Sequence, residues 1–307
     1  MAMAVYEQKY KRYAGPLTPE WSRFLIIPHH AYRGVFKSKL FTAFFVVCFV
    51  PLLVEAILIY LHHNMNALGV MRLQIRELIP IDATFFQTFV NLQGGFAFFV
   101  ALLVGPPLVS RDLRNNALPL YLCRPFSRTE YVLGKMSVVL ILLSAITWVP
   151  QVLLFLFQSY LEGFTWFREN LWMLFAIIVG SVVWILLLAL ISQAVSALVK
   201  WRVIASGVIL AIFFIPSVFA EFFNLVFLTH WGHLMSLAGL MRNISAGLFG
   251  TFAETTTTMR MEGFDGTLRE VVLTEPPLWL NWGMLFLVCA ACLALLSRKV
   301  KAYEVVK

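Results

Sequence analysis

Two acidic side chains stand inside or at the edge of long apolar stretches of the sequence. Glu55 lies within the first such stretch, and Glu221 closes a later one. An ionisable group surrounded by hydrocarbon is costly and often lines an ion or substrate pathway. The pattern therefore predicts a translocation path or a coupling-ion site at Glu55 and Glu221. For Glu55 a second interpretation stays open, a hydrogen bond that joins two helices. The neutral polar residues of these stretches are Asn91, Gln93, Gln151, Ser192, Gln193 and Ser196. For the amides among them, hydrogen bonding between helices is the favoured interpretation.

The residue types that bind metals or attack substrates are few and form no known catalytic motif. His230 and His233, in the stretch HWGH, would share one helix face and could bind a metal ion, but histidines at a membrane interface are the favoured interpretation. Cys289 and Cys292 are spaced C-x-x-C inside an apolar stretch, which favours small buried residues over a redox pair. Neither H-E-x-x-H nor G-x-S-x-G occurs. We therefore expect no catalytic residue and no metal site in this chain.

A nucleotide site of the phosphate-loop type is also not expected. Residues 133–136, LGKM, look like the end of such a loop. The loop needs Gly five residues before its last Gly and Ser or Thr after its Lys. Thr129 and Met136 occupy those positions. The chain itself should bind no ATP or Mg²⁺ by this device.

The elements that must position these residues are membrane helices. The chain has 307 residues, of which 60% are hydrophobic and 13% charged, against about 25% charged residues in soluble domains. A hydrocarbon core about 30 Å thick needs about 20 apolar residues per helix. The sequence predicts an all-α polytopic protein with six membrane-spanning helices at residues 40–61, 88–109, 132–157, 171–199, 203–223 and 278–296.

The basic residues alternate between the two sides of these predicted helices. One side, made of residues 1–39, 110–135, 200–202 and 298–307, carries 18 of the 24 Lys and Arg residues. The positive-inside rule places that side, and with it both termini, in the cytoplasm. Most of the net charge of +8 then serves to orient the chain in the membrane and to contact anionic lipids. No basic surface with interleaved aromatic residues stands outside the membrane, so nucleic acid is not an expected partner.

Three regions flank or interrupt the six-helix domain, which spans residues 40–297. Residues 1–39 are predicted to form a cytoplasmic N-terminal region with an interfacial amphipathic helix, broken near Pro28. Residues 224–277 are predicted to lie outside, first as helices that dip part-way back into the membrane and then as a hairpin that turns at Asp265 and Gly266. Residues 298–307 form a cytoplasmic tail.

The connection after the second predicted helix, residues 110–135, is basic between two apolar stretches. Ser110 is a candidate N-cap, and Asp112 suits the first turn of a short helix. Its apolar face would hold Leu113, Ala117, Leu120 and Tyr121. The stretch SRTE at residues 127–130 forms a capping box, with Phe126 and Tyr131 as a hydrophobic staple. The pattern predicts a short amphipathic helix, a rigid corner and a new membrane helix. The alternative is a plain basic loop on anionic lipid.

This stretch, SRDLRNNALPLYLCRPFSRTEYVLGK, resembles the signature of permease subunits of ABC transporters of the type-2 exporter class. That pattern is roughly S-x-(D/E)-x-x-x-G-T-L-x-x-L-L-x-x-P-(I/V)-S-R-x-x-x-x-x-G-K. The sequence departs from it where Asn116 and Ala117 replace Gly-Thr and where Pro119 follows the Leu. The matching residues are Ser110, Asp112, Leu118, Leu122, Pro125, Ser127, Arg128, Gly134 and Lys135.

The resemblance implies one membrane half of an ATP-driven exporter in the bacterial cytoplasmic (inner) membrane. Its partners would be separate ABC ATPase subunits, which hold ATP and Mg²⁺, and a second permease chain, like or unlike. Segment 110–135 would be the coupling helix, seated on the ATPase through Arg111, Asp112, Leu113, Leu118, Leu120, Tyr121, Arg124, Pro125, Ser127 and Arg128. Two alternatives remain, a non-transporting subunit that transmits ATPase motion to an extracytoplasmic partner, and a polytopic membrane enzyme.

Overall fold

The computed structural model of the protein describes residues 26–64, 80–115, 128–199, 201–252, 257–262, 268–273 and 275–299. Their regular secondary structure is helical apart from one short hairpin. In chain order the elements are α1 (Ile26–Val35), α2 (Lys39–Val47), α3 (Val50–His63), α6 (Ala83–Arg114), α8 (Arg128–Ile146), α9 (Trp148–Glu162), α10 (Phe164–Glu169), α11 (Leu171–Leu198), α12 (Arg202–Phe227), the 3₁₀ helix η2 (Trp231–Met235), α13 (Leu237–Leu248), β1 (Thr257–Glu262), β2 (Leu268–Leu273) and α14 (Leu278–Lys299).

The six membrane-spanning helices predicted from the sequence are confirmed. The described residues contain six helical segments that are long and apolar enough to cross a membrane: Lys39–His63, Ala83–Ser110, Glu130–Glu162, Leu171–Leu198, Arg202–Phe227 and Leu278–Arg298. The predicted ends agree with these to within a few residues, because a run of apolar residues is a local property of the sequence. Two of the segments each consist of two consecutive helices: α2 and α3 form the first segment, and α8 and α9 form the third.

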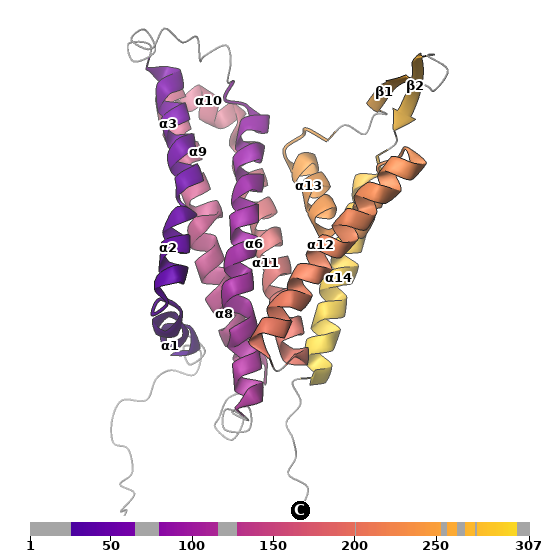
Figure 1. Ribbon diagram of the computed structural model, residues 1–307. Coiled ribbons are helices and arrows are strands. Elements are labelled where there is room, and N and C mark those ends of the chain that lie inside the picture. The colour runs from indigo at the N-terminus through magenta and orange to yellow at the C-terminus, as the bar shows by residue number, and fades with distance from the viewer. Residues whose placement is uncertain are drawn as a thin grey trace, which may run out of the picture.

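Helix α11 is the central element of the bundle. It contacts α6, α8, α9, α12, α13 and α14, and every residue from Leu187 to Ser196 is buried. A helix that is apolar around its whole circumference is expected in such a position. Helices α6 and α11 lie between two groups, with α2, α3, α8 and α9 on one side and α12, α13 and α14 on the other (Figure 1).

Small residues let α6 and α11 approach closely. A Cβ on Gly105 would collide with the Ser192 side chain, so this position of α6 has no room for a larger residue. One turn after Ser192 on α11, Ser196 Oγ donates to Pro106 O of α6 at 2.6 Å and accepts from Ser110 N at 2.8 Å. Close packing and side-chain hydrogen bonds of this kind are what hold membrane helices together.

The first and third membrane-spanning segments are each interrupted near a proline. One side chain donates hydrogen bonds to backbone carbonyls at both interruptions. Pro150 has no N–H, so Ile146 O loses its usual donor at the end of α8. Gln93 Nε2 of α6 donates to Ile146 O at 2.5 Å and to Cys48 O, where α2 ends, at 2.9 Å. In a membrane such carbonyls must find donors on neighbouring helices. The prediction that Gln93 joins helices by hydrogen bonding is therefore confirmed.

The N-terminal helix is described from Ile26 onward. Helix α1 is continuous from Ile26 through Pro28 to Val35, and residues 20–25, on the other side of the break predicted near Pro28, lie outside the described residues. The chain bends between α1 and α2, where Ser38 Oγ accepts from Phe41 N as the N-cap of α2. Helix α1 packs against α8, and Tyr32 Oη donates to Val138 O at 3.4 Å.

The segment before α14 contains the partial helices and the hairpin that the sequence predicts. Helix α13 has 12 residues, about 18 Å at 1.5 Å per residue, too short to cross a 30 Å core. It packs against α11, α12 and α14. Strands β1 and β2 pair antiparallel, with Glu262 opposite Leu268, so the hairpin is confirmed. Its predicted turn at Asp265 and Gly266 lies outside the described residues.

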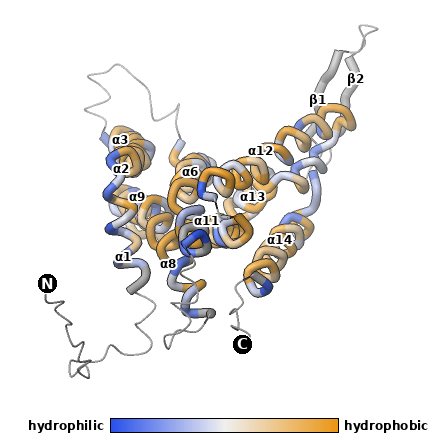
Figure 2. The backbone as a smooth tube through the Cα atoms, turned by 60° about the horizontal axis from the view of Figure 1, so that its bottom comes forward, coloured by the Kyte–Doolittle hydropathy of each residue, from blue (hydrophilic) through white to orange (hydrophobic). Residues whose placement is uncertain are grey.

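Large apolar side chains cover the outside of the bundle. On α12, Val203 is 81% exposed and Leu225 71%, and on α14 Phe286 is 79% exposed. Both helices are coloured as hydrophobic over most of their length in Figure 2. Apolar surface of this extent requires lipid or another protein against it. The end of α6, the start of α8, helix α1 and the end of α14 lie at one end of the bundle, and α10 and the hairpin lie at the other (Figure 1).

Candidate functional site

The ends of α6 and α8 are tied together by an ion pair. Lys135 Nζ of α8 lies 2.8 Å from Asp112 Oδ2 of α6, and the two side chains are 9% and 13% exposed. Tyr131 Oη donates to the same oxygen at 2.8 Å. Asp112 is the third residue of segment 110–135 and Lys135 is its last. The ion pair therefore holds the two ends of the segment together. We call the group formed by Asp112, Tyr131 and Lys135 the α6–α8 corner.

No helix begins at Ser110, in contrast to the sequence prediction. Ser110 was expected to be an N-cap, but α6 continues through it to Arg114 as one helix. The Ser110 hydroxyl donates to Pro106 O at 2.6 Å instead. Pro106 and Pro107 disturb the helix here, and Ser110 with Ser196 supplies hydrogen bonds that keep α6 continuous through the disturbance.

The other predicted coupling residues are only partly described. Helix α8 begins at Arg128, where the capping box predicts a helix start. Arg111 and Leu113 lie on the last turn of α6. The remaining predicted contacts with an ATPase lie outside the described residues, and they are Leu118, Leu120, Tyr121, Arg124, Pro125 and Ser127.

A cavity of about 460 Å³ adjoins the corner. Asp112, Lys135 and Arg202 line it together with His30 and with Pro107 of α6. It lies where α1, α2, α6, α8 and α12 meet. A ligand or a partner side chain that entered it would contact the corner and α12 at the same time.

Glu55 is fully buried in the first membrane-spanning segment, and its hydrogen-bond partner is on another helix. Gln151 Nε2 of α9 donates to Glu55 Oε2 at 2.8 Å, while Glu55 Oε1 has no hydrogen-bond partner. Glu55 lines neither the cavity beside the corner nor a smaller apolar cavity of about 290 Å³ among α6, α11 and α13. The geometry supports the hydrogen-bonding interpretation of Glu55 over a path through these cavities.

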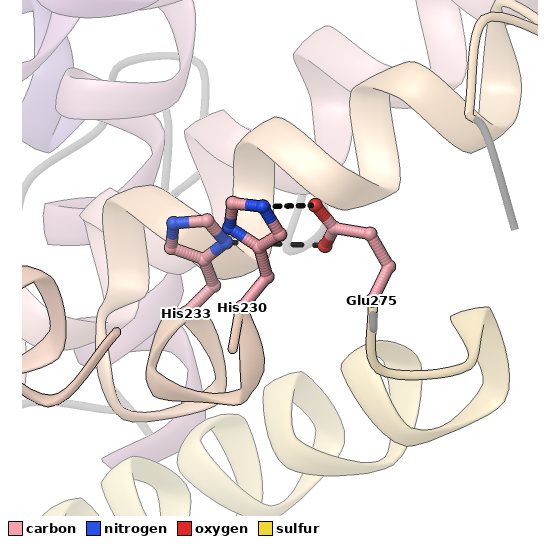
Figure 3. A group of neighbouring side chains, drawn as sticks. All are labelled: His230, His233 and Glu275. Carbon is pink, nitrogen blue, oxygen red and sulfur yellow. Dashed lines mark ion pairs between the residues drawn. The ribbon is translucent and has the colours of Figure 1, made fainter. Parts of the chain in front are cut away.

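At the opposite end of the bundle, His230, His233 and Glu275 gather around one point (Figure 3). One ligand atom from each lies within 4.8 Å of the other two. His230 Nε2 is 3.8 Å from Glu275 Oε1, and His233 Nδ1 is 4.0 Å from Glu275 Oε2. We call these three residues the outer cluster. Two histidines and a carboxylate are a ligand set that transition metals accept.

Local sequence explains how the histidines are held. Leu228 ends α12 in the left-handed region, with φ 48°, and the chain turns back into η2. Asn224 Oδ1 then accepts from Gly232 N at 2.7 Å. A Cβ on Gly232 would collide with Ala220 O and Asn224 Oδ1, so glycine is required between the histidines. The histidine rings stack with centroids 5.3 Å apart, as expected for side chains three residues apart on a 3₁₀ turn.

Two charged residues flank His233. Arg242 of α13 lies with Nη2 2.8 Å from His233 Nε2, and Glu221 Oε1 of α12 lies 3.7 Å from the same nitrogen. Burial of the ring, and then the positive charge of Arg242, lower the pKa of His233 to about 4. His233 is therefore neutral at pH 7. Glu221, predicted as a path or ion residue, is 70% exposed at this cluster.

Sequence reasoning missed Glu275 and Arg242 as neighbours of the histidines. Both are distant from HWGH along the chain, and no spacing pattern links them to it.

Cys289 and Cys292 are free thiols on α14, in agreement with their interpretation as small residues of a membrane helix.

Compared with known protein families and with curated proteins, the chain matches none.

Proposed function

We propose that this chain is the membrane-spanning permease subunit of an ATP-driven ABC exporter. It lies in the bacterial cytoplasmic membrane with both termini in the cytoplasm. It couples ATP hydrolysis on a separate ATPase chain to the movement of a substrate across or out of the membrane. Segment 110–135 is the contact with the ATPase, and residues of this chain carry no catalytic step.

The observation that carries the proposal is the ion pair between Asp112 and Lys135. Both residues match the permease signature, and the ion pair joins them across the segment. A push on the loop between them is transmitted to α6 and α8 together, because the corner holds both helix ends. Helix α6 is tied to the central helix α11 at Gly105, Pro106 and Ser110. Motion at the loop can thus reach the core of the bundle.

The partners follow from the same proposal. ABC ATPases hold ATP and Mg²⁺ and contact the basic and apolar residues of segment 110–135. A second permease chain, like or unlike this one, covers part of the exposed apolar surface, and lipid covers the rest. Anionic lipids contact the basic residues on the cytoplasmic side.

A non-transporting role is the second candidate. The outer elements η2, α13 and the hairpin could contact an extracytoplasmic partner, and the corner would then transmit ATPase motion to that partner. Substrate-stimulated ATPase activity in sealed vesicles separates the two roles. A membrane enzyme is the least favoured class, because the sequence holds no known catalytic motif.

The experiment introduces a charge on the predicted apolar face of the loop. Leu113→Asp and Leu120→Asp would bury an unpaired charge against the ATPase, at a cost of several kcal/mol. We expect both proteins to insert normally and to lose ATPase co-purification or coupled turnover. Arg124→Ala is the control and should be milder, because a surface ion pair with an acid of the ATPase would contribute only about 0–1 kcal/mol. Leu113→Asp and Leu120→Asp proteins that bind the ATPase and work at the normal rate would contradict the proposal.

A further inference from the structure

We propose that the outer cluster is a binding site for a divalent transition-metal ion of the Zn²⁺ class. His230, His233 and Glu275 supply the ligands, and the site joins η2 to the residues that lead from the hairpin into α14. The inference rests on the geometry of the cluster and does not depend on the proposed transport function.

The distances suit a metal with small movements of the side chains. Zn²⁺ binds imidazole nitrogen and carboxylate oxygen at about 2.0–2.2 Å, which places the ligand atoms of a tetrahedral site about 3.3–3.5 Å apart. His230 Nε2 lies 3.8 Å from Oε1 of Glu275 and His233 Nδ1 lies 4.0 Å from its Oε2, and one ligand atom from each residue lies within 4.8 Å of the other two. Side-chain movements of roughly 1–1.5 Å bring two imidazole nitrogens and one carboxylate oxygen to the spacing that one ion requires. Two nitrogens and one oxygen leave a fourth position for water.

Two buried atoms of the cluster have no hydrogen-bond partner. They are Nδ1 of His230 and Oε2 of Glu275. A bound ion is one of the groups that satisfy such buried polar atoms. An ion at this position would use the Glu275 oxygen directly and would draw the His230 ring to it.

The charges around the cluster favour a divalent cation. Glu275 contributes one negative charge, and Glu221 contributes a second beside His233 Nε2. A histidine that binds a metal through one nitrogen usually donates its other N–H to a carboxylate. Glu221 can accept that hydrogen bond when His233 binds the ion through Nδ1.

The positive charge of Arg242 opposes binding of a cation at the outer cluster. The Arg242 guanidinium lies 2.8 Å from His233 Nε2 and repels a cation bound at the cluster. Arg242 also lines the 290 Å³ apolar cavity, which gives the side chain room to turn away. Binding of the ion and the contact between Arg242 and His233 should therefore compete.

The test is a Zn²⁺ titration of the full chain, purified in detergent with a tag that contains no histidine. We expect one Zn²⁺ per chain by calorimetry and by metal analysis, with no binding of Mg²⁺. His233→Ala and Glu275→Gln should abolish binding at Zn²⁺ concentrations that saturate the unchanged protein. Glu221→Gln should weaken binding about tenfold, the lower end of the effect of a carboxylate behind a ligand.

Two further variants make the result specific. The double variant His62→Ala and His63→Ala removes the other outward histidine pair and should still bind one Zn²⁺. Arg242→Gln should bind at least about tenfold more tightly, the effect expected for one charge about 6 Å from a divalent ion even at the dielectric constant of water. Glu275→Gln keeps the shape of the side chain, and its elution as a single symmetric peak checks the fold.

The proposal is overturned by any of three results. The first is an unchanged protein that binds no Zn²⁺. The second is a Glu275→Gln protein that elutes normally and binds Zn²⁺ with unchanged affinity. The third is loss of binding in the His62 and His63 double variant together with retention in His233→Ala.

Discussion

At the scale of single residues, Glu55 shows how a buried acid can be either a functional group or a contact between helices. Its carboxylate lies between α3 and α9, accepts one hydrogen bond from Gln151, and lines neither described cavity. Hydrogen bonds between membrane helices contribute about 0.6 kcal/mol on average. The geometry favours a contact role.

We therefore expect Glu55→Gln to insert, assemble and work at close to the normal rate. A glutamine at this position still offers Gln151 Nε2 an acceptor. Glu55→Leu should lower stability by about 1–3 kcal/mol, because it leaves the buried Gln151 amide without that acceptor. Thermal unfolding in detergent and turnover in vesicles measure the two effects. A Glu55→Gln protein that assembles normally but has no turnover in vesicles would show that Glu55 lines a translocation path or an ion site.

At the scale of elements, the helix breaks are the points where the bundle depends on side chains of other helices. Gln93 of α6 is hydrogen-bonded to the ends of both α2 and α8. The first and third membrane-spanning segments are thereby fixed to the second at the point where each is interrupted. The two-part shape of these segments is a property of the bundle as well as of Pro51 and Pro150.

Gln93→Leu should lower the free energy of unfolding by about 2 kcal/mol or more, because two carbonyls lose a donor in a buried place. Asn91→Leu is the matched control, since Asn91 is an exposed amide on the same helix. It should unfold at nearly the unchanged temperature. Equal destabilisation by the two substitutions would show that Gln93 does not act through the helix breaks.

At the scale of the whole molecule, the two ends of the bundle are chemically different. Among the described residues, the end with α1, the α6–α8 corner and the end of α14 carries most of the basic residues, and the other end carries α10, the outer cluster and the hairpin. The positive-inside rule predicts that the basic end is cytoplasmic. The proposed ATPase contact and the proposed metal site would then lie on opposite sides of the membrane.

Topology is tested by single-cysteine labelling with an impermeant reagent in a cysteine-free background. Cysteines introduced at Lys9, Arg128 and Lys301 should be protected in intact cells, and cysteines at Arg168 and Thr256 should be labelled. Each position should react after the membrane is permeabilised, which controls for accessibility. Labelling of position 128 from outside would overturn the six-helix orientation.

The sequence by itself determined the features that depend on neighbouring residues. The six membrane-spanning helices and the β1–β2 hairpin follow from runs, periods and turn residues within one segment. Such patterns are decided by hydration and local backbone preferences. They can be identified before any packing is known.

Local reasoning was wrong where packing overrides local preference. Ser110 is a good N-cap by type, but Pro106 and Ser196 offer it other hydrogen bonds, and α6 continues past it. The position of the residue within its helix decided the outcome.

Only the tertiary structure decided which distant residues meet. The pairing of Asp112 with Lys135, the contacts of Gln93 with two helix ends, and the approach of Glu275 to the histidines each depend on how helices are placed side by side. No local spacing encodes that placement, because it follows from the fit of whole helix surfaces, such as Gly105 against Ser192. The residue types were visible in the sequence, whereas the sites they form arise from packing.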